Sequence, residues 1–467
     1  MPWPRRWCRK GQKDGHAMES VASGSPHPTP ADIPIERPIK HNTAQIDEGD
    51  SPGITTPPEQ WSYAAEFPFA TAQGERPGGR LVVRITARAS AGVVGFGCIG
   101  DDGEHLVERH LGSLHPFEYI DLRLDDGQRC KSIIVRNVAS TGQASRVEIR
   151  SIMTGPVEWA EAQMPETFVD DSSLSRFRPW SGVTPRGYWS DWLGVRTSAE
   201  IWTFDHEDPE ACSRERRDSP ALPSADEDVV DWIPLIDSVA ASAGTFVMAE
   251  LGTGWGRWLS AGAFAARQLG LDYRLYGVEA EPTHFAWTER HLRENGLDPQ
   301  RYAIVQAAVS DLEGACWFRI GNPAQWYGQS IVPERAVAPE ISANAALGSE
   351  IVIDDARLRR VRCLDLQAVL RDLPIVDYMH LDIQEAEADF LGAHPDLLDK
   401  RVRMVNIGTH LAEIEDRLRR LFSRLGWRSL FDVPLGTVTR LKVGAQPAKR
   451  VEFQDGVQVW RNERQLG

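Results

Sequence analysis

The segment from 246 to 282 constrains the fold more than any other part of the chain. An apolar run typical of a buried strand leads into the turn ELGTGWG, an apolar helical pattern follows, and a second strand pattern ends in the carboxylate of Glu279. The turn has three glycines at alternate positions: Gly252, Gly254 and Gly256. Glycines at such a turn let the backbone approach a ligand that faces the following helix N-terminus. The segment therefore predicts a nucleoside-binding unit.

The spacing of the glycines and the acidic residues indicates which nucleoside cofactor this unit binds. A dinucleotide site has G-x-G-x-x-G and an acid about 20 residues further on. Here the pattern is G-x-G-x-G, Glu250 precedes Gly252 by two residues, and Glu279 follows it by 27. A carboxylate beside the turn repels phosphates but suits an ammonium group, and Glu279 can accept the ribose hydroxyls. The pattern favours S-adenosylmethionine, with a dinucleotide site or a ligand-free strand–turn–helix as the alternatives.

Composition narrows the class of protein. The 467 residues leave room for two or three domains, and a net charge of −15 argues against a broad nucleic-acid footprint. The six cysteines form no C-x-x-C pair, which indicates neither a zinc knuckle nor a disulfide framework and makes the cytoplasm the expected compartment. No apolar window reaches 18 residues and no signal-peptide core follows the basic N-terminus, so we expect no integral membrane association.

Four segments differ in pattern. Residues 1–65 are rich in Pro, Ser, Thr and Gly and predict a disordered tail. Residues 66–155 show short alternating runs separated by GDDG and DDG turns, which predicts a jelly-roll-like β-sandwich. Residues 156–225 form an aromatic-rich connector, whose aromatic side chains either pack on the next domain or supply an acceptor pocket. Residues 226–467 alternate strand and helix patterns.

The aromatic residues inside the predicted sandwich strands are expected to be core rather than a stacking platform for a sugar. They are Phe96, Phe117 and Tyr119.

The alternation in the last segment predicts a doubly wound, mostly parallel sheet, in which ligands bind at the carboxyl ends of the strands. Glu250, Glu279, Asp382 and His410 all end strand patterns, so we expect them to share one site. The long irregular segment 322–348 is either a lid over the acceptor or a surface excursion.

Several motifs in this order resemble the FkbM-family methyltransferases, over a little more than half of the chain. They are AELGTGWGRWL at 249–259, VEAEP at 278–282, AAVSD at 307–311, HLDIQEAEADFL at 380–391, NIGTH at 406–410 and DGVQVWRN at 455–462. The resemblance implies a class I, Rossmann-like methyltransferase domain and O-methylation of a hydroxyl on a sugar, glycan or polyketide-like acceptor. It also implies an adenine near the end of the strand 302–309. The cofactor-binding residues are then Glu250, Gly252, Gly254, Gly256, Glu279 and Ala308.

One position departs from the family pattern. Members usually have D-x-x-G-A-E in the fourth motif, whereas Glu385 stands in place of the glycine here. A glycine there allows a close backbone approach. The departure leaves open a catalytically decayed domain that serves as a glycan-binding or interaction protein.

An alcohol acceptor needs a group that takes its proton during methyl transfer. We expect His410 or Asp382 to act as this base, with Glu387 orienting the site and His380 nearby. The alternative is that His380 is a satisfied histidine at a strand end and that Glu387 only caps a helix. Asp382 and His410 alone do not make a coordination set, so no metal is predicted.

Three functions therefore stay in view: an O-methyltransferase acting on a small molecule or glycan, a binding protein with a decayed methyltransferase domain, and an NAD-dependent oxidoreductase. Nothing in the sequence supports the third beyond the glycine turn. Oligomer formation is possible, and the sequence does not specify it.

Overall fold

The computed structural model describes most of the chain. It covers residues 30–465 with gaps at 36–37, 48–50, 72–73, 114–118, 140–141, 165, 202–211, 322–328 and 354.

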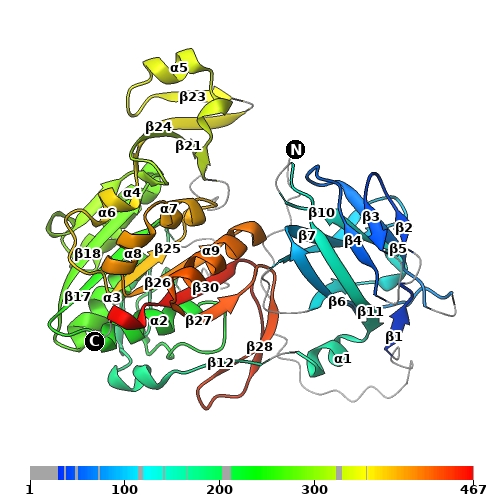
Figure 1. The fold of residues 1–467 in the computed structure, drawn as a ribbon. Coiled ribbons are helices and arrows are strands. Elements are labelled where there is room, and N and C mark those ends of the chain that lie inside the picture. Colours follow the sequence, from blue (N-terminus) through cyan, green and yellow to red (C-terminus); the bar gives the residue numbers. More distant parts are fainter. Residues whose placement is uncertain are drawn as a thin grey trace.

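The N-terminal part of the chain folds into two antiparallel sheets that enclose one hydrophobic core (Figure 1). The first sheet has the order β3 (Gln45–Asp47), β4 (Gly53–Thr55), β11 (Arg146–Gly155), β6 (Leu81–Ala91) and β9 (Tyr119–Leu124), with β1 (Ala31–Ile33) paired to β11. The second has the order β2 (Ile39–Lys40), β5 (Tyr63–Pro68), β10 (Cys130–Asn137), β7 (Val93–Gly100) and β8 (His105–Gly112). Phe96 is fully buried in the core, Tyr119 is half-buried under the Arg84 guanidinium, and Phe117 lies outside the described residues.

The prediction that residues 1–65 form a disordered tail is wrong for the described residues from 30 onward. Strands β1 to β5 all begin before residue 65, and residues 1–29 of the predicted tail lie outside the described residues. These strands are short, and apolar residues such as Ile33 and Ile54 occur singly among prolines and polar residues. They are buried because longer strands elsewhere in the chain pair with them, so no local hydrophobic period marks them in the sequence.

The connector, residues 156–225, leads from the N-terminal sheets to the C-terminal domain. It contains α1 (Val157–Ala162), β12 (Glu166–Val169), β13 (Gly182–Thr184), β14 (Tyr188–Ser190), β15 (Arg196–Ser198) and β16 (Arg216–Asp218). Strand β12 pairs with β28 (Val438–Val443), which in turn pairs with β29 (Lys449–Glu452). Trp192 packs edge-on against Trp232, which packs against Trp258, with ring centroids 5.5 and 5.0 Å apart. Trp192 of the connector therefore packs on the C-terminal domain.

The C-terminal domain is built on a seven-stranded sheet. Its order is β19 (Ala303–Gln306), β18 (Asp272–Glu279), β17 (Thr245–Leu251), β25 (Tyr378–Leu381), β26 (Met404–Thr409), β30 (Gly456–Arg461) and β27 (Arg428–Val433). Only β30 runs antiparallel to its neighbours. This order, with one antiparallel strand next to the last, is that of class I methyltransferases, so the predicted Rossmann-like fold is confirmed.

Helices cover both faces of this sheet, because each face carries its own apolar cluster. On one face lie α2 (Val229–Ala241), α3 (Arg257–Gln268) and α4 (Pro282–Glu294). On the other lie α6 (Leu366–Leu370), α7 (Glu387–Ala393), α8 (Pro395–Arg401) and α9 (Ala412–Leu425). None of the helices in the part of the chain described is long and apolar enough to cross a bilayer.

A small second sheet projects from the C-terminal domain as an arm, residues 314–364 (Figure 1). It contains β21 (Gly314–Ile320), β22 (Ile331–Val332), α5 (Pro339–Asn344), β23 (Glu350–Ile353) and β24 (Ala356–Leu364), and β24 also pairs with β20 (Ala308–Val309). Trp317, Val337 and Leu358 form a core within the arm. The described residues of the irregular segment 322–348 belong to this arm.

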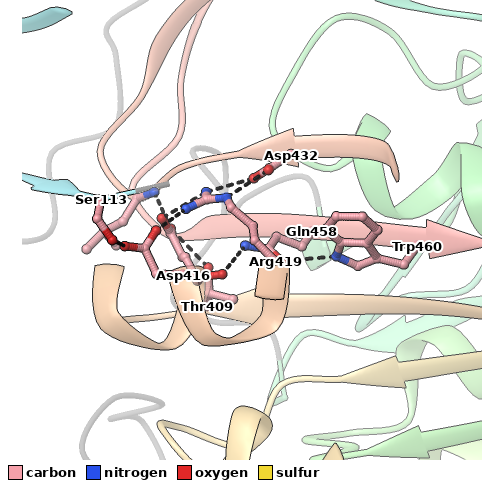
Figure 2. Close-up of polar contacts among 9 residues, drawn as sticks. Ser113, Thr409, Asp416, Arg419, Asp432, Gln458 and Trp460 are labelled. Atoms are coloured by element: carbon pink, nitrogen blue, oxygen red, sulfur yellow. Dashed lines mark hydrogen bonds and ion pairs between the residues drawn. The ribbon is translucent and has the colours of Figure 1, made fainter. Parts of the chain in front are cut away.

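The two domains touch at the start of α9. Val93 and Val138 of the N-terminal sheets form a small apolar cluster with Ala412. Nearby, the Ser113 hydroxyl donates to Asp416 at 2.9 Å, and the Arg109 guanidinium donates to Glu452 at 3.2 Å (Figure 2 shows the Ser113 contact). The N-terminal domain is therefore anchored close to the carboxyl end of β26.

Candidate cofactor and catalytic site

The glycine turn is shaped by contact with the neighbouring strand. All three glycines have positive φ: 79° at Gly252, 56° at Gly254 and 76° at Gly256, which caps α3. A Cβ on Gly252 would lie 1.9 Å from the carbonyl oxygen of Asp382, just beyond β25. No side chain fits at this distance, so the turn can close onto β25 only with glycine.

Glu250 is held by the helix that follows the turn. Its carboxylate is buried and accepts a hydrogen bond from the Leu259 amide of α3 at 2.9 Å. Burial raises the pKa of Glu250 to about 7, against the opposing effects of His380, the α3 amides and Arg257. Glu250 therefore anchors α3 to β17, directly before the turn.

Glu279 ends β18 and faces the same turn. One carboxylate oxygen accepts from the Gly254 amide at 2.8 Å and the other from the Glu281 amide at 2.9 Å. Burial raises its pKa to about 7 as well. Glu250, Glu279 and the three glycines thus meet at adjacent strand ends, as the sequence predicts.

Ala308 lies beside this group, and its side chain packs into a small apolar cluster with Ala280 and Cys363. The preceding Ala307 amide donates to the Glu279 carbonyl at 3.0 Å, which ties β20 to the end of β18.

A second cluster follows β25 and β26. The His410 Nε2 lies 2.9 Å from the Gln384 side-chain nitrogen and 3.5 Å from Asp382, and its Nδ1 lies 3.7 Å from Glu387. Burial alone would lower the pKa of His410, but Glu387, Asp382 and Asp455 outweigh it and raise the pKa to about 9. The structure therefore joins three of the four predicted catalytic residues around one imidazole.

Glu387 is the first residue of α7 and is fully buried. One of its oxygens accepts from the Ile383 and Glu385 amides, each at 3.3 Å, and the same oxygen faces His410. Glu387 thus supports the turn before α7 and also faces the imidazole, and its printed contacts are with amides that precede α7 rather than with amides of the helix itself.

His380 is placed differently. It lies 3.6 Å from Asp231 of α2, and its ring packs 5.7 Å from Trp258. Burial alone would lower its pKa, but Asp231, Glu250 and Asp382 raise it. Its nearest ionic partner is therefore on α2 rather than in the His410 cluster, and its buried Nδ1 has no hydrogen-bond partner among the described residues.

Two residues near His410 were not singled out from the sequence. Gln384 contacts His410 directly, and Asp455 acts on it electrostatically because Gly456 pairs with Thr409 across β30 and β26. Asp455 lies in the DGVQVWRN motif, whose Asp-Gly pair at a strand start was the available signal.

A buried network supports the end of β26 from α9 (Figure 2). The Thr409 hydroxyl donates to Glu415 at 3.2 Å, and Arg419 donates to Asp416 at 2.9 Å and to Asp432 at 2.8 Å. Burial raises the pKa of Glu415 to about 7, with Arg419 opposing that shift. The network fixes the residue directly before His410 and ends at the contact with the N-terminal domain.

The comparisons with known proteins give one relative with clear sequence similarity. No family model matches the chain. A stretch of 264 residues, 56% of this chain, is 26% identical to a protein described as a putative methyltransferase from Jannaschia sp. (strain CCS1), over 89% of that protein.

Solved structures are less similar. A precorrin-6y C5,15-methyltransferase from Geobacter metallireducens GS-15 matches 49% of this chain and 86% of its own at 8% identity, with a TM-score of 0.27. A methyltransferase FkbM from Methylobacillus flagellatus KT matches 46% of this chain and 44% of its own at 11% identity, with a TM-score of 0.28. Scores this low support no conclusion about this chain.

Proposed function

We propose that this protein is an S-adenosylmethionine-dependent O-methyltransferase that acts on a hydroxyl of a sugar, glycan or polyketide-like acceptor. The main observation behind the proposal is the close approach of Gly252 to the Asp382 carbonyl. It brings the predicted cofactor-binding turn next to the cluster that contains Asp382 and His410. The similarity to a putative methyltransferase and the strand order of the sheet support the same enzyme class.

The residues at the glycine turn fit this cofactor. Two buried carboxylates, Glu250 and Glu279, lie beside the N-terminus of α3, which suits an ammonium group and a ribose diol better than a pyrophosphate. Arg257, the cation closest to the turn in sequence, is bound to Asp228 at 2.6 Å. When bound, the sulfonium cofactor supplies an electrophilic methyl group.

The second cluster supplies the proton acceptor. We assign His410 in its neutral form as the base that removes the acceptor's hydroxyl proton, with the resulting imidazolium stabilised by Glu387 and Asp382. A pKa of about 9 makes His410 a strong base for an alcohol, although only a minority is neutral near pH 7. Glu387 faces Nδ1 at 3.7 Å, so Nε2, which lies beside Gln384, is the nitrogen that takes the proton.

A decayed methyltransferase remains the second candidate, because Gln384 and Glu385 have φ of 56° and 79°. A non-glycine residue in this region is strained by about 1–2 kcal/mol. The decayed protein would bind S-adenosylmethionine without turnover. The five cysteines in the described residues form no disulfide with one another, which fits the proposed cytoplasmic location.

Calorimetric titration of the full chain with S-adenosylmethionine, S-adenosylhomocysteine and NAD tests the cofactor assignment. We expect binding of the two adenosyl ligands, none of NAD, and a loss of about tenfold or more in Glu279→Gln. Glu289→Gln is the matched control, because Glu289 is partly exposed on α4 and pairs with Arg293 at 3.1 Å. Equal binding by both variants would remove Glu279 from the site.

Methyl transfer from labelled S-adenosylmethionine to a panel of oligosaccharides and hydroxylated small molecules then tests turnover. Labelled product that is lost in His410→Ala supports the enzyme. Tight cofactor binding with no transfer to any acceptor would favour the decayed alternative.

A further inference from the structure

We propose that the outer face of the five-stranded sheet in the N-terminal domain binds a neutral carbohydrate chain, with Trp61 as its stacking platform. The inference does not depend on the proposed methyl transfer. The face is formed by side chains that alternate with the core residues of β5, β10, β7 and β8. Its polar and aromatic members include Trp61, Tyr63, Glu66, Glu108, His110 and Arg136.

Trp61 has an unusual backbone. Its φ is 68°, a region that bulky residues rarely adopt, and 44% of its surface is exposed. The conformation is imposed by Asn137, whose carbonyl accepts from the Trp61 amide at 2.7 Å and whose amide donates to the Ser62 carbonyl at 3.0 Å. The fully buried Asn137 side chain donates to the Gln143 carbonyl at 2.9 Å. Strain held in this way on an exposed aromatic residue is typical of a binding site.

The polar groups beneath Trp61 are ordered before any ligand arrives. Arg136 on β10 reaches over Gly95 of β7 to form a two-pronged ion pair with Glu108 on β8. A Cβ on Gly95 would lie 2.4 Å from the Glu108 carboxylate, so glycine makes this pair possible. The guanidinium also lies 4.6 Å from the centre of the Trp61 ring. The platform is therefore fixed from below by a cation–π contact and an ion pair.

Further polar groups continue along the same face. The Tyr63 hydroxyl lies 2.8 Å from His105 Nε2, and His41 lies 3.0 Å from Glu66. The His110 ring lies 6.0 Å from the Trp61 ring, and its Nε2 is 3.6 Å from Glu108. Hydroxyl, imidazole and carboxylate groups thus form a row that begins at the indole.

A sugar fits this surface better than other ligands. A pyranose has an apolar C–H face that stacks on an aromatic ring and a rim of hydroxyls that need both donors and acceptors. A protein partner would need a larger apolar centre, yet Ile39 and Trp61 are the exposed large apolar residues among those described between 30 and 155. The carboxylates of Glu66 and Glu108 oppose a nucleic acid, and Arg136 offsets the charge of Glu108.

The face also lies beside the C-terminal domain. Val138, next to Asn137 on β10, accepts a hydrogen bond from the Gln60 side chain at 3.1 Å and packs against Ala412 at the start of α9. A carbohydrate held at Trp61 would therefore be bound near the domain junction.

Affinity electrophoresis of the full chain through gels containing xylan, galactomannan, β-glucan or dextran tests the proposal. We expect at least one of these neutral polysaccharides to retard the protein, and Trp61→Gly to weaken the retardation by roughly tenfold or more. Glycine accepts the positive φ, so this variant keeps the fold. Glu108→Gln, which breaks the charge pair with Arg136, should lose part of the retardation.

Asp355→Gly is the matched control, because Asp355 also has a positive φ, of 64°, but lies on the arm. Calorimetry with S-adenosylmethionine on each variant reports separately on the cofactor site. A fifth gel, with anionic alginate, tests for binding by charge alone. Free migration of the wild-type protein in the four neutral gels, retardation only in the alginate gel, or equal retardation of Trp61→Gly and the wild-type protein would each overturn the proposal.

Discussion

Two turns at the same edge of the C-terminal sheet adopt left-handed backbone conformations with opposite choices of residue. The turn after β17 uses glycine at 252, 254 and 256, each with positive φ. The turn after the adjacent β25 has positive φ at Gln384 and Glu385, where the FkbM pattern would place a glycine at the second. Both turns border the same proposed site.

The difference follows from crowding. At Gly252 a Cβ would meet the main chain of Asp382, which cannot move aside. At Gln384 the side chain reaches His410 at 2.9 Å. Glycine is thus required where two main chains touch, whereas at Gln384 the strained backbone carries a side chain that contacts His410.

The largest expected effect comes from closing the first turn. Gly252→Ala places a Cβ against the Asp382 carbonyl, so we expect a loss of about 3 kcal/mol or more in unfolding free energy, or failure to fold, and no adenosyl binding. Gly244→Ala is the control, because its φ is 76° but no atom lies within 4 Å of the added Cβ. Urea unfolding measures both variants, and equal losses would show that crowding is not the reason for Gly252.

Substitutions in the cluster of His410 and Asp382 should lower the rate of methyl transfer more than the affinity for S-adenosylmethionine. We expect His410→Ala and Asp382→Asn to lower kcat/KM by roughly 10²–10⁴-fold, with the dissociation constant for S-adenosylmethionine changed by less than about threefold. His394→Ala is the control, since this histidine pairs with Asp365 at 3.0 Å, between α6 and α8. Near-normal turnover in both site variants would exclude the pair from the chemistry.

The raised pKa of His410 predicts two pH dependences. As a base it must be neutral, so kcat/KM should rise with pH until about pH 9. Its folded pKa lies above the unfolded value near 6.5, so the stability it contributes is full below that value and is lost as pH rises through 9. Asp382→Asn should move the kinetic midpoint to lower pH. A profile that is flat between pH 7 and 9.5 would contradict the assignment.

The smallest effect tests the second turn itself. Glu385→Gly relieves a positive φ at an exposed position, so we expect a gain of about 0–1 kcal/mol in unfolding free energy and retained activity. Gln384→Gly relieves the same kind of strain but removes the contact with His410, so its activity should fall. If Glu385→Gly instead raised activity many-fold, Glu385 would be the residue that impairs the site.

Some features could be predicted because they are local or follow from parallel topology. The strand and helix patterns of residues 246–279 are continuous in sequence, and parallel strands bring their carboxyl ends to one edge, which placed Glu250, Glu279, Asp382 and His410 together. The strands between residues 31 and 68 could not be predicted, because their burial depends on partners far along the chain.

The sequence by itself determined the order of elements, the glycine turn and the acidic strand ends, since these depend on residue type and short-range period. Only the tertiary structure decided that His380 faces Asp231, that Asp455 lies near His410, and that Trp61 stands strained and exposed above Arg136. Each of these is a contact between residues distant in the chain, and such contacts are set by packing and strand register rather than by local pattern.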